Sequence, residues 1–166
     1  MPSLVTATDK PAARRRAGGL FVLALLLLAL ALALPAGASA FGSSGGGWVK
    51  QTSGSTGDLR DVAFTDATHG WAVGDGGAIL ATTDGGATWS AQSSGSTVSL
   101  GAVAFTDATH GWAVGKDGTI LATTDGGATW RGQSSGSSAY LNAIAFGDAT
   151  HGWVVGTDGT ILALAD

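Results

Sequence analysis

The sequence contains no cysteine and no glutamate. Without cysteine the chain has no disulfide, no thiolate metal site and no cysteine nucleophile. All 12 acidic residues are aspartate, and 28 residues are glycine. Glutamate is a strong helix former, whereas aspartate and glycine favour turns. Together with abundant Thr, Val and Trp, this composition predicts an all-β fold beyond the N-terminus.

Positive charge is also scarce after residue 40. Eleven aspartates stand there against four basic residues, so this part carries 4 − 11 = −7 charges. Such a surface repels phosphate backbones, which argues against nucleic-acid binding. The four basic residues are Lys50, Arg60, Lys116 and Arg131.

The N-terminal 40 residues have the pattern of an export signal. A basic stretch, Lys10–Arg16, precedes 15 consecutive apolar residues, Leu20–Leu34, and Ala38-Ser39-Ala40 follows. This order is typical of a secretory signal peptide cleaved after Ala40. The alternative is an uncleaved membrane anchor at 17–36, because about 20 apolar residues can cross a bilayer. Either reading predicts an exported protein, with 41–47 as a Gly/Ser linker.

The rest of the chain is a repeat. Twenty-five of 28 positions are identical between Val62–Trp89 and Val103–Trp130, at an offset of 41 residues, and a third copy starts at Ile144. A period near 40 with short apolar runs is typical of β-propeller blades. We therefore predict three repeats over 48–166, at about 48–88, 89–129 and 130–166.

One repeat reads as four short strands joined by Asp/Gly turns, which are typical of tight hairpins. In the first copy we expect them at Leu59–Phe64, Trp71–Gly74, Ala78–Thr83 and Trp89–Gln92. Trp48–Gln51 matches the fourth of these strands but lacks a blade of its own.

The third copy stops after its third strand. Three blades cannot close a ring, because propellers have roughly four to eight. We therefore predict a partial propeller of three four-stranded blades. Its open edges predict self-association, most simply a six-bladed dimer. The alternative is a fragment that forms an open arc.

Aspartate, glycine and tryptophan recur in the turn before the last strand of a blade. The carboxylate can accept hydrogen bonds from backbone N–H groups two or three residues on, and the tryptophan can cover the turn. Calcium ligation is the alternative, but it needs six or more oxygens and each turn offers one carboxylate. We therefore expect a structural role, and no metal or cofactor. The residues are Asp84, Gly86, Trp89, Asp125, Gly127 and Trp130.

A histidine recurs in each copy, at His69, His110 and His151, within Asp-Ala-Thr-His-Gly-Trp. Equivalent residues of a propeller surround one axis, so a pore-facing trio could bind a metal or an anion. The other interpretation is a turn histidine that pairs with its own aspartate. We favour the turn, since duplication alone copies a residue into every repeat.

Two longer strings resemble known families. Thr82–Trp89 and Thr123–Trp130 match the Asp-box, S/T-x-D-x-G-x-T-W, of bacterial-neuraminidase-type (BNR) repeats. The string Gly70–Trp89 resembles the repeat of the photosystem II stability/assembly factor family. That resemblance implies an exported propeller of about six or seven blades that chaperones reaction-centre assembly by binding a protein partner. It implies a location in the periplasm, at the cell surface or in the thylakoid lumen.

Catalysis is not expected, and we assign no catalytic residue. Sialidases that carry Asp-boxes use an arginine cluster, a tyrosine nucleophile and a glutamate. After residue 40 this chain has Arg60, Arg131 and Tyr140 but no glutamate. The expected function is a non-enzymatic scaffold. A carbohydrate- or matrix-binding module is the alternative, and an Asp-box glycosidase ranks last.

Overall fold

A computed structural model describes residues 47–164, and these residues form an all-β structure. The predicted signal or anchor, and all of the linker except Gly47, lie outside them. Among the described residues no helix is long and apolar enough to cross a membrane. The strands are β1 (Leu59–Phe64), β2 (Gly70–Gly74), β3 (Ile79–Thr82), β4 (Ser90–Gln92), β5 (Leu100–Phe105), β6 (Gly111–Gly115), β7 (Ile120–Thr123), β8 (Arg131–Gln133), β9 (Leu141–Phe146), β10 (Gly152–Gly156) and β11 (Ile161–Ala163).

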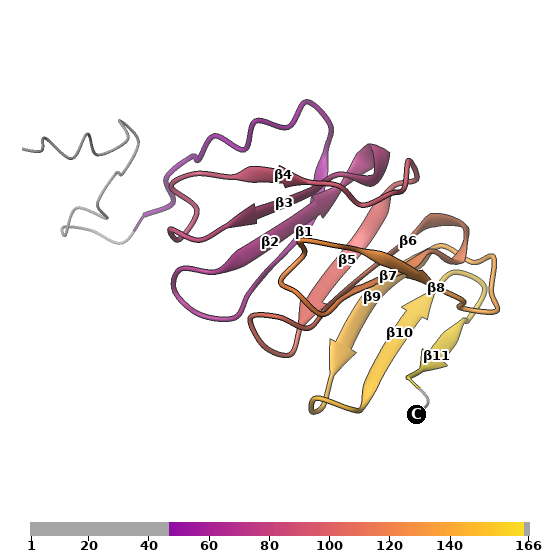
Figure 1. The fold of residues 1–166 in the computed structure, drawn as a ribbon. Coiled ribbons are helices and arrows are strands. Elements are labelled where there is room, and N and C mark those ends of the chain that lie inside the picture. Colours follow the sequence, from indigo (N-terminus) through magenta and orange to yellow (C-terminus); the bar gives the residue numbers. More distant parts are fainter. Residues whose placement is uncertain (1–46, 165–166) are drawn as a thin grey trace, which may run out of the picture. The chain divides into compact units, whose positions relative to one another are not determined.

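The strands form three antiparallel sheets, one for each repeat (Figure 1). The sheet orders are β1-β2-β3-β4, β5-β6-β7-β8 and β9-β10-β11, so every strand pairs with its neighbour in the chain. The first strands lie next to each other, because β1 packs against β5 and β5 against β9. The predicted all-β, propeller-like fold is confirmed. The third sheet has three described strands, as the end of the third copy indicated.

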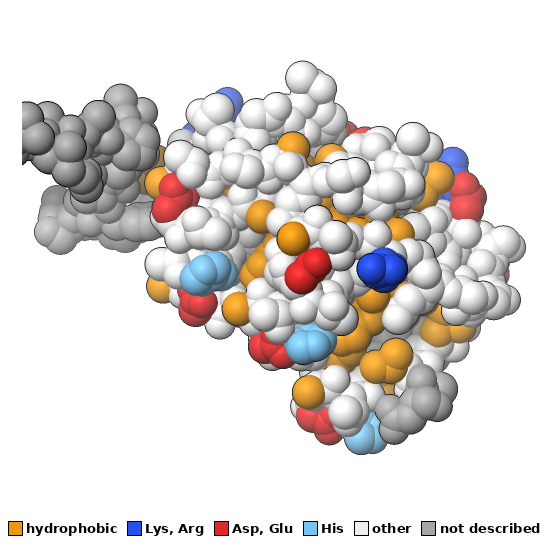
Figure 2. All heavy atoms as spheres, in the orientation of Figure 1, with side chains coloured by type: hydrophobic (Ala, Val, Ile, Leu, Met, Phe, Trp, Pro, Cys, Tyr) orange, Lys and Arg blue, Asp and Glu red, His pale blue; other side chains and the backbone are white. Residues whose placement is uncertain are grey.

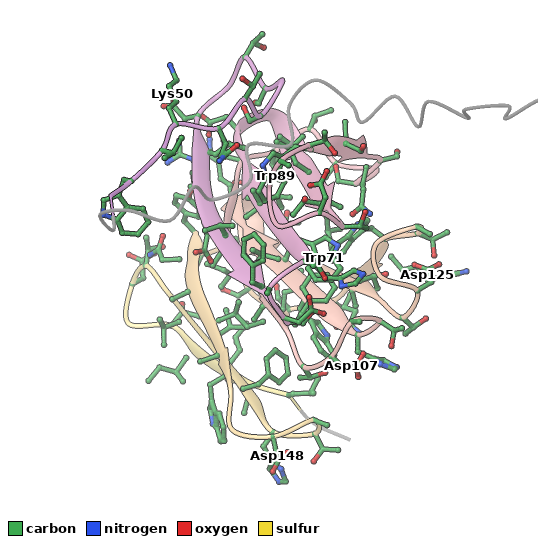
Figure 3. All side chains as sticks on the ribbon, turned by 90° about the vertical axis from the view of Figure 1, so that its left-hand side faces the viewer. Lys50, Trp71, Trp89, Asp107, Asp125 and Asp148 are labelled. Carbon is green, nitrogen blue, oxygen red and sulfur yellow. The ribbon has the colours of Figure 1, made fainter. Side chains whose placement is uncertain are left out.

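The segment Trp48–Gln51 differs from the prediction, because it forms no strand. Its residues are exposed, and Trp48 has no covering neighbour. A lone segment of four residues has no backbone partners for its N–H and C=O groups, so a strand forms only beside another strand. Figure 3 labels Lys50 on this segment.

The hydrophobic core lies between the sheets and is divided into two parts. The first part joins the first two sheets through buried side chains that include Trp71, Val73 and Leu100. The second joins the last two sheets around Val114 and Leu141, both 0 % exposed. Each sheet alone is too small to exclude water from both faces, so the fold depends on stacking.

Each sheet has a β-bulge in its first strand and a tight turn beside it. In β1 the register shifts between Leu59 and Asp61, which leaves Arg60 as the extra residue. The 3-10 turn Asp75–Gly77 then follows β2, and its Asp75 N–H donates to the Asp58 carbonyl at 2.9 Å. A bulge redirects the side chain of the extra residue. The same shift occurs in β5 and β9, where Gly101 and Asn142 are the extra residues.

Gly76 and Gly77 form a matched pair for a test of this turn. Both have a positive φ, 68° and 74°, which disfavours any residue with a Cβ. A Cβ on Gly76 would meet nothing within 4 Å, whereas one on Gly77 would lie 2.1 Å from the Ser96 carbonyl oxygen. The second repeat already has Asp117 where the first has Gly76.

We expect Gly76→Ala to lower the free energy of unfolding by about 1 kcal/mol, the usual penalty of a left-handed alanine. Gly77→Ala should cost at least about 2 kcal/mol more, because the connection to the next sheet must also move. Urea unfolding followed by tryptophan fluorescence measures both. Equal losses for the two variants would contradict the role assigned to this contact.

Candidate functional site

The two Asp-box turns have the same hydrogen bonds. The Thr88 backbone N–H donates to Asp84 Oδ1 at 2.8 Å, and its hydroxyl donates to Oδ2 at 2.6 Å. Thr82 Oγ1 also donates to Asp84, at 2.8 Å, and accepts the Gly86 N–H at 2.9 Å. The carboxylate therefore bonds the backbone four residues on, rather than two or three. Asp125 repeats these bonds with Thr123 and Thr129 in the second sheet.

The second Asp-box turn also joins two blades. Its Gly126 carbonyl accepts hydrogen bonds from Trp71 Nε1 at 3.0 Å and Gln92 Nε2 at 3.2 Å, both in the first sheet. Trp130 Nε1 in turn donates to Gln92 Oε1 at 3.3 Å. Gly127 lies under the same amide, and a Cβ there would meet Gln92 Oε1 at 2.1 Å. We interpret the box as both a turn and a blade-to-blade joint.

The first box shows how its tryptophan and second glycine lie. Gly86 is buried with φ 87°, and a Cβ on it would lie 3.5 Å from the Trp89 indole. Trp89 is half-buried and packs edge-to-face on Phe64, with ring centroids 6.1 Å apart. The indole thus covers the turn, and Figure 3 labels it near Trp71.

The three histidines lie in separate turns at one end of the sheets. His69 Nδ1 is 2.9 Å from Asp66 Oδ2, and the His69 backbone N–H donates to Asp66 Oδ1 at 2.9 Å. His110 and His151 repeat this with Asp107 and Asp148. Figure 2 shows each histidine beside an acidic side chain, and Figure 3 labels the last two aspartates.

These pairs have the geometry of turn supports. Hydrogen bonds from the Thr68 hydroxyl and from the backbone hold the pKa of Asp66 well below its usual range. Within residues 47–164 no three His, Cys, Asp or Glu side chains come close enough to hold a metal ion. We therefore interpret the histidines as members of the turns.

Sequence reasoning missed a different surface, formed at the bulges. We call it the bulge surface and define it by Arg60, Asp75, Gly101, Lys116 and Tyr140. Arg60 Nε donates to Asp75 Oδ1 at 2.7 Å. Tyr140, from the third repeat, lies over the bulge glycine of the second: a Cβ on Gly101 would be 3.2 Å from its ring. Residues of all three repeats therefore meet on one surface.

The charges of this surface are coupled across the repeats. The Arg60 hydrogen bond is the main reason that the pKa of Asp75 is lowered, and a hydrogen bond from Ser99 of the second repeat adds to it. The pKa of Arg60 is raised, first by Asp75 and then by the nearby Tyr140. Because Arg60 is exposed, its guanidinium can also face a ligand.

One signal in the sequence points to this surface. The only three differences between Val62–Trp89 and Val103–Trp130 all fall in one turn: Asp75/Lys116, Gly76/Asp117 and Ala78/Thr119. The bulge residues Arg60, Gly101 and Asn142 also differ among the three copies, as do Asp58, Ser99 and Tyr140 two positions before them. Divergence at one end of near-identical repeats is expected of a binding surface. The Asp-Ala-Thr-His turns at the other end, by contrast, have the same sequence in all three repeats.

A sequence model of the family described as Photosynthesis system II assembly factor YCF48 matches residues 44–99 and 96–166. Together these ranges span residues 44–166, which is all of the repeat region and well over half of the chain. The chain belongs to this family. The resemblance carried by Gly70–Trp89 is thereby confirmed.

Solved structures of family members have the same fold. YCF48 from Cyanidioschyzon merolae is 28 % identical, with a TM-score of 0.62 over 70 % of this chain and 40 % of its own. A structure described as YCF48 bound to D1 peptide is 26 % identical, with a TM-score of 0.61 over 71 % and 40 %. The chain thus spans about 40 % of the length of these relatives. A search of curated proteins finds no match.

The Asp-box carboxylates predict a specific acid response. Hydrogen bonds from Thr88 and Thr129 lower the pKa of Asp84 and of Asp125 to about 2. The unfolded chain, with an ordinary pKa of about 3.9, therefore binds more protons between roughly pH 4 and pH 2. The stabilisation is complete above that window and is lost as the pH falls through it.

We expect Asp125→Asn to lower stability at pH 7 and to flatten the fall in stability between pH 4 and 2. Close to one proton fewer should be taken up on unfolding in that window. Urea titrations at a series of pH values measure this slope. Asn142→Ala, at an exposed position of β9 that carries no ionisable group, is the control and should keep the original slope. An unchanged slope in the Asp125 variant would show that its carboxylate is not held as described.

Proposed function

We propose that this protein is a non-enzymatic, extracytoplasmic scaffold that binds a peptide segment of a photosystem II protein. The proposal rests on the family membership and on the relative described as bound to D1 peptide. Export is supported by the sequence of residues 10–40. Chaperoning of assembly needs selective binding and no chemical step, so a recognition surface is sufficient.

The bulge surface is the binding site that we assign. It combines an exposed guanidinium, a carboxylate and a half-buried phenol, which together can bind peptide carboxylates, amides and apolar side chains. Tyrosine and arginine are, with tryptophan, enriched among the residues that contribute most to binding energy at the centre of interfaces. The observation that carries this assignment is the meeting of Arg60, Gly101 and Tyr140 from three successive repeats.

We also propose that the protein self-associates. The arc has exposed apolar side chains at both ends, such as Phe64 in the first sheet and Trp153 in the third. Exposed apolar faces and free strand edges favour contact with another chain. This part of the proposal is independent of peptide binding.

Replacement of Arg60 tests the binding site. We expect Arg60→Ala to weaken binding of a fluorescein-labelled D1 peptide by at least about tenfold, the usual loss when a charged hydrogen bond is removed. Arg60→Lys should lose part of that, since it keeps the charge but not the planar fork. Fluorescence anisotropy of the full chain, at two salt concentrations, gives the affinities.

Arg131→Ala is the matched control, because Arg131 is also an exposed arginine but lies on β8, away from the bulges. It should bind the peptide as the unmodified protein does. The site assignment fails if both variants bind equally well. The function itself fails if the unmodified protein does not bind the peptide at all.

A further inference from the structure

The contact between the first two blades is built around one tryptophan. Trp71 is 3 % exposed and stacks on Phe105, with ring centroids 3.6 Å apart and planes at 14°. Its Nε1 donates to the Gly126 carbonyl of the second Asp-box turn. One face of a blade therefore carries Trp, Val and Ile side chains. These side chains pack on Leu, Val and Phe side chains of the next blade.

The contact between the second and third blades is only partly made. Trp112 packs on Phe146, with ring centroids 4.5 Å apart. Its buried Nε1, however, has no hydrogen-bond partner among the described residues. A buried indole N–H without a partner is costly, so an acceptor from another segment would stabilise this joint.

The two ends of the arc have complementary faces. Trp153 is the third-repeat equivalent of Trp71, yet it is 46 % exposed. At the other end Val62, the equivalent of Val103, is 54 % exposed, whereas Val103 is 4 % exposed. Each end thus carries one half of the contact that joins the first two blades. The exposed residues are Trp153, Val155 and Ile161 at one end and Leu59, Val62 and Phe64 at the other.

A groove beside β11 matches the surroundings of a blade's last strand. It has a volume of about 600 Å³ and is lined by Trp112, Gln133, Phe146 and Leu162, among others. In the preceding blade Trp130 packs edge-to-face on Phe105 and donates to Gln92. Phe146 and Gln133 are the equivalents of these two partners. The groove lies between the second and third sheets, where Figure 2 shows apolar side chains at the surface.

The segment Trp48–Gln51 has the residues that this groove would hold. It begins with tryptophan and ends with glutamine, as do Trp89–Gln92 and Trp130–Gln133. In this structure it does not pair with β11, which has β10 as its one partner among the described strands. It precedes β1, and the second sheet separates β1 from the third, since β1 packs on β5 and β5 on β9 (Figure 1). A second copy can supply it.

We propose that a second copy of the chain docks head-to-tail on the third blade, and that its Trp48–Gln51 becomes the fourth strand beside β11. The register follows from β3–β4 and β7–β8, in which Ala81 pairs with Ser90 and Ala122 with Arg131. Ala163 then pairs with Val49 of the other copy, and Trp48 enters the groove. Applied twice about a two-fold axis, this contact closes a ring of six blades. It specifies the self-association proposed above and does not depend on the peptide site.

Disulfide trapping tests this register, because the chain has no cysteine of its own. Full chains with Val49→Cys and with Ala163→Cys, carrying different tags, are co-expressed and mildly oxidised. Directly opposed residues of antiparallel strands are close enough for a disulfide. We expect a covalent heterodimer that carries both tags on a non-reducing gel. Adding Trp48→Ala to the first chain should abolish it, whereas adding Arg131→Ala should not.

A control pair and a double variant make the outcome decisive. Val49→Cys with Thr97→Cys, an exposed residue between the first two blades, reports random collision. A heterodimer yield for Ala163→Cys no higher than for Thr97→Cys would overturn the proposal. Trapping only within one chain of a Val49→Cys/Ala163→Cys double variant would also overturn it. Arg60→Ala should cross-link normally, which separates failure of this interface from failure of peptide binding. Loss of the cross-link on adding D1 peptide to that variant would assign the groove to the peptide instead.

Discussion

The structure depends on the stacking of an indole from one blade on a phenylalanine of the next. No sheet within residues 47–164 has more than four strands, and none of these sheets can bury its apolar faces alone. Trp71 stacks on Phe105, and its indole N–H donates to a carbonyl of the second Asp-box turn. This one side chain therefore links a buried strand of the first blade to both a strand and a turn of the second. The Asp-box therefore contributes to stability in two ways, through its own turn and through the carbonyl that it presents.

The two ends of each sheet have different roles. The Asp-Ala-Thr-His turns are the same in all three repeats, and their bonds stay within the turn. At the opposite end the bulges carry a different residue in each repeat, and Tyr140 of the third repeat lies over the bulge glycine Gly101 of the second. Duplication copies what a blade needs in order to fold, and a binding surface arises where the copies have diverged. We propose that the bulge surface is such a place in this family member.

Much of the fold could be predicted from the sequence, because periodicity and turn residues act locally. The strand Leu59–Phe64 and the turn Asp75–Gly77 lie where the alternation and the Asp-Gly-Gly string indicated. The bulge surface could not be predicted, since it depends on a register shift at Arg60 and on a close approach of Tyr140 to Gly101. Both are properties of packing between repeats. Trp48–Gln51 shows the same limit, because a strand sequence forms no strand without a neighbour.

The central claim is that the third blade presents half of a contact that a second chain completes. Hydrogen–deuterium exchange of β11 in the full chain, over a range of protein concentrations, tests it most directly. The account predicts that β11 amides exchange more slowly as the concentration rises, while those of β3, already covered by β4, do not change. Fast exchange of β11 at every concentration would contradict it.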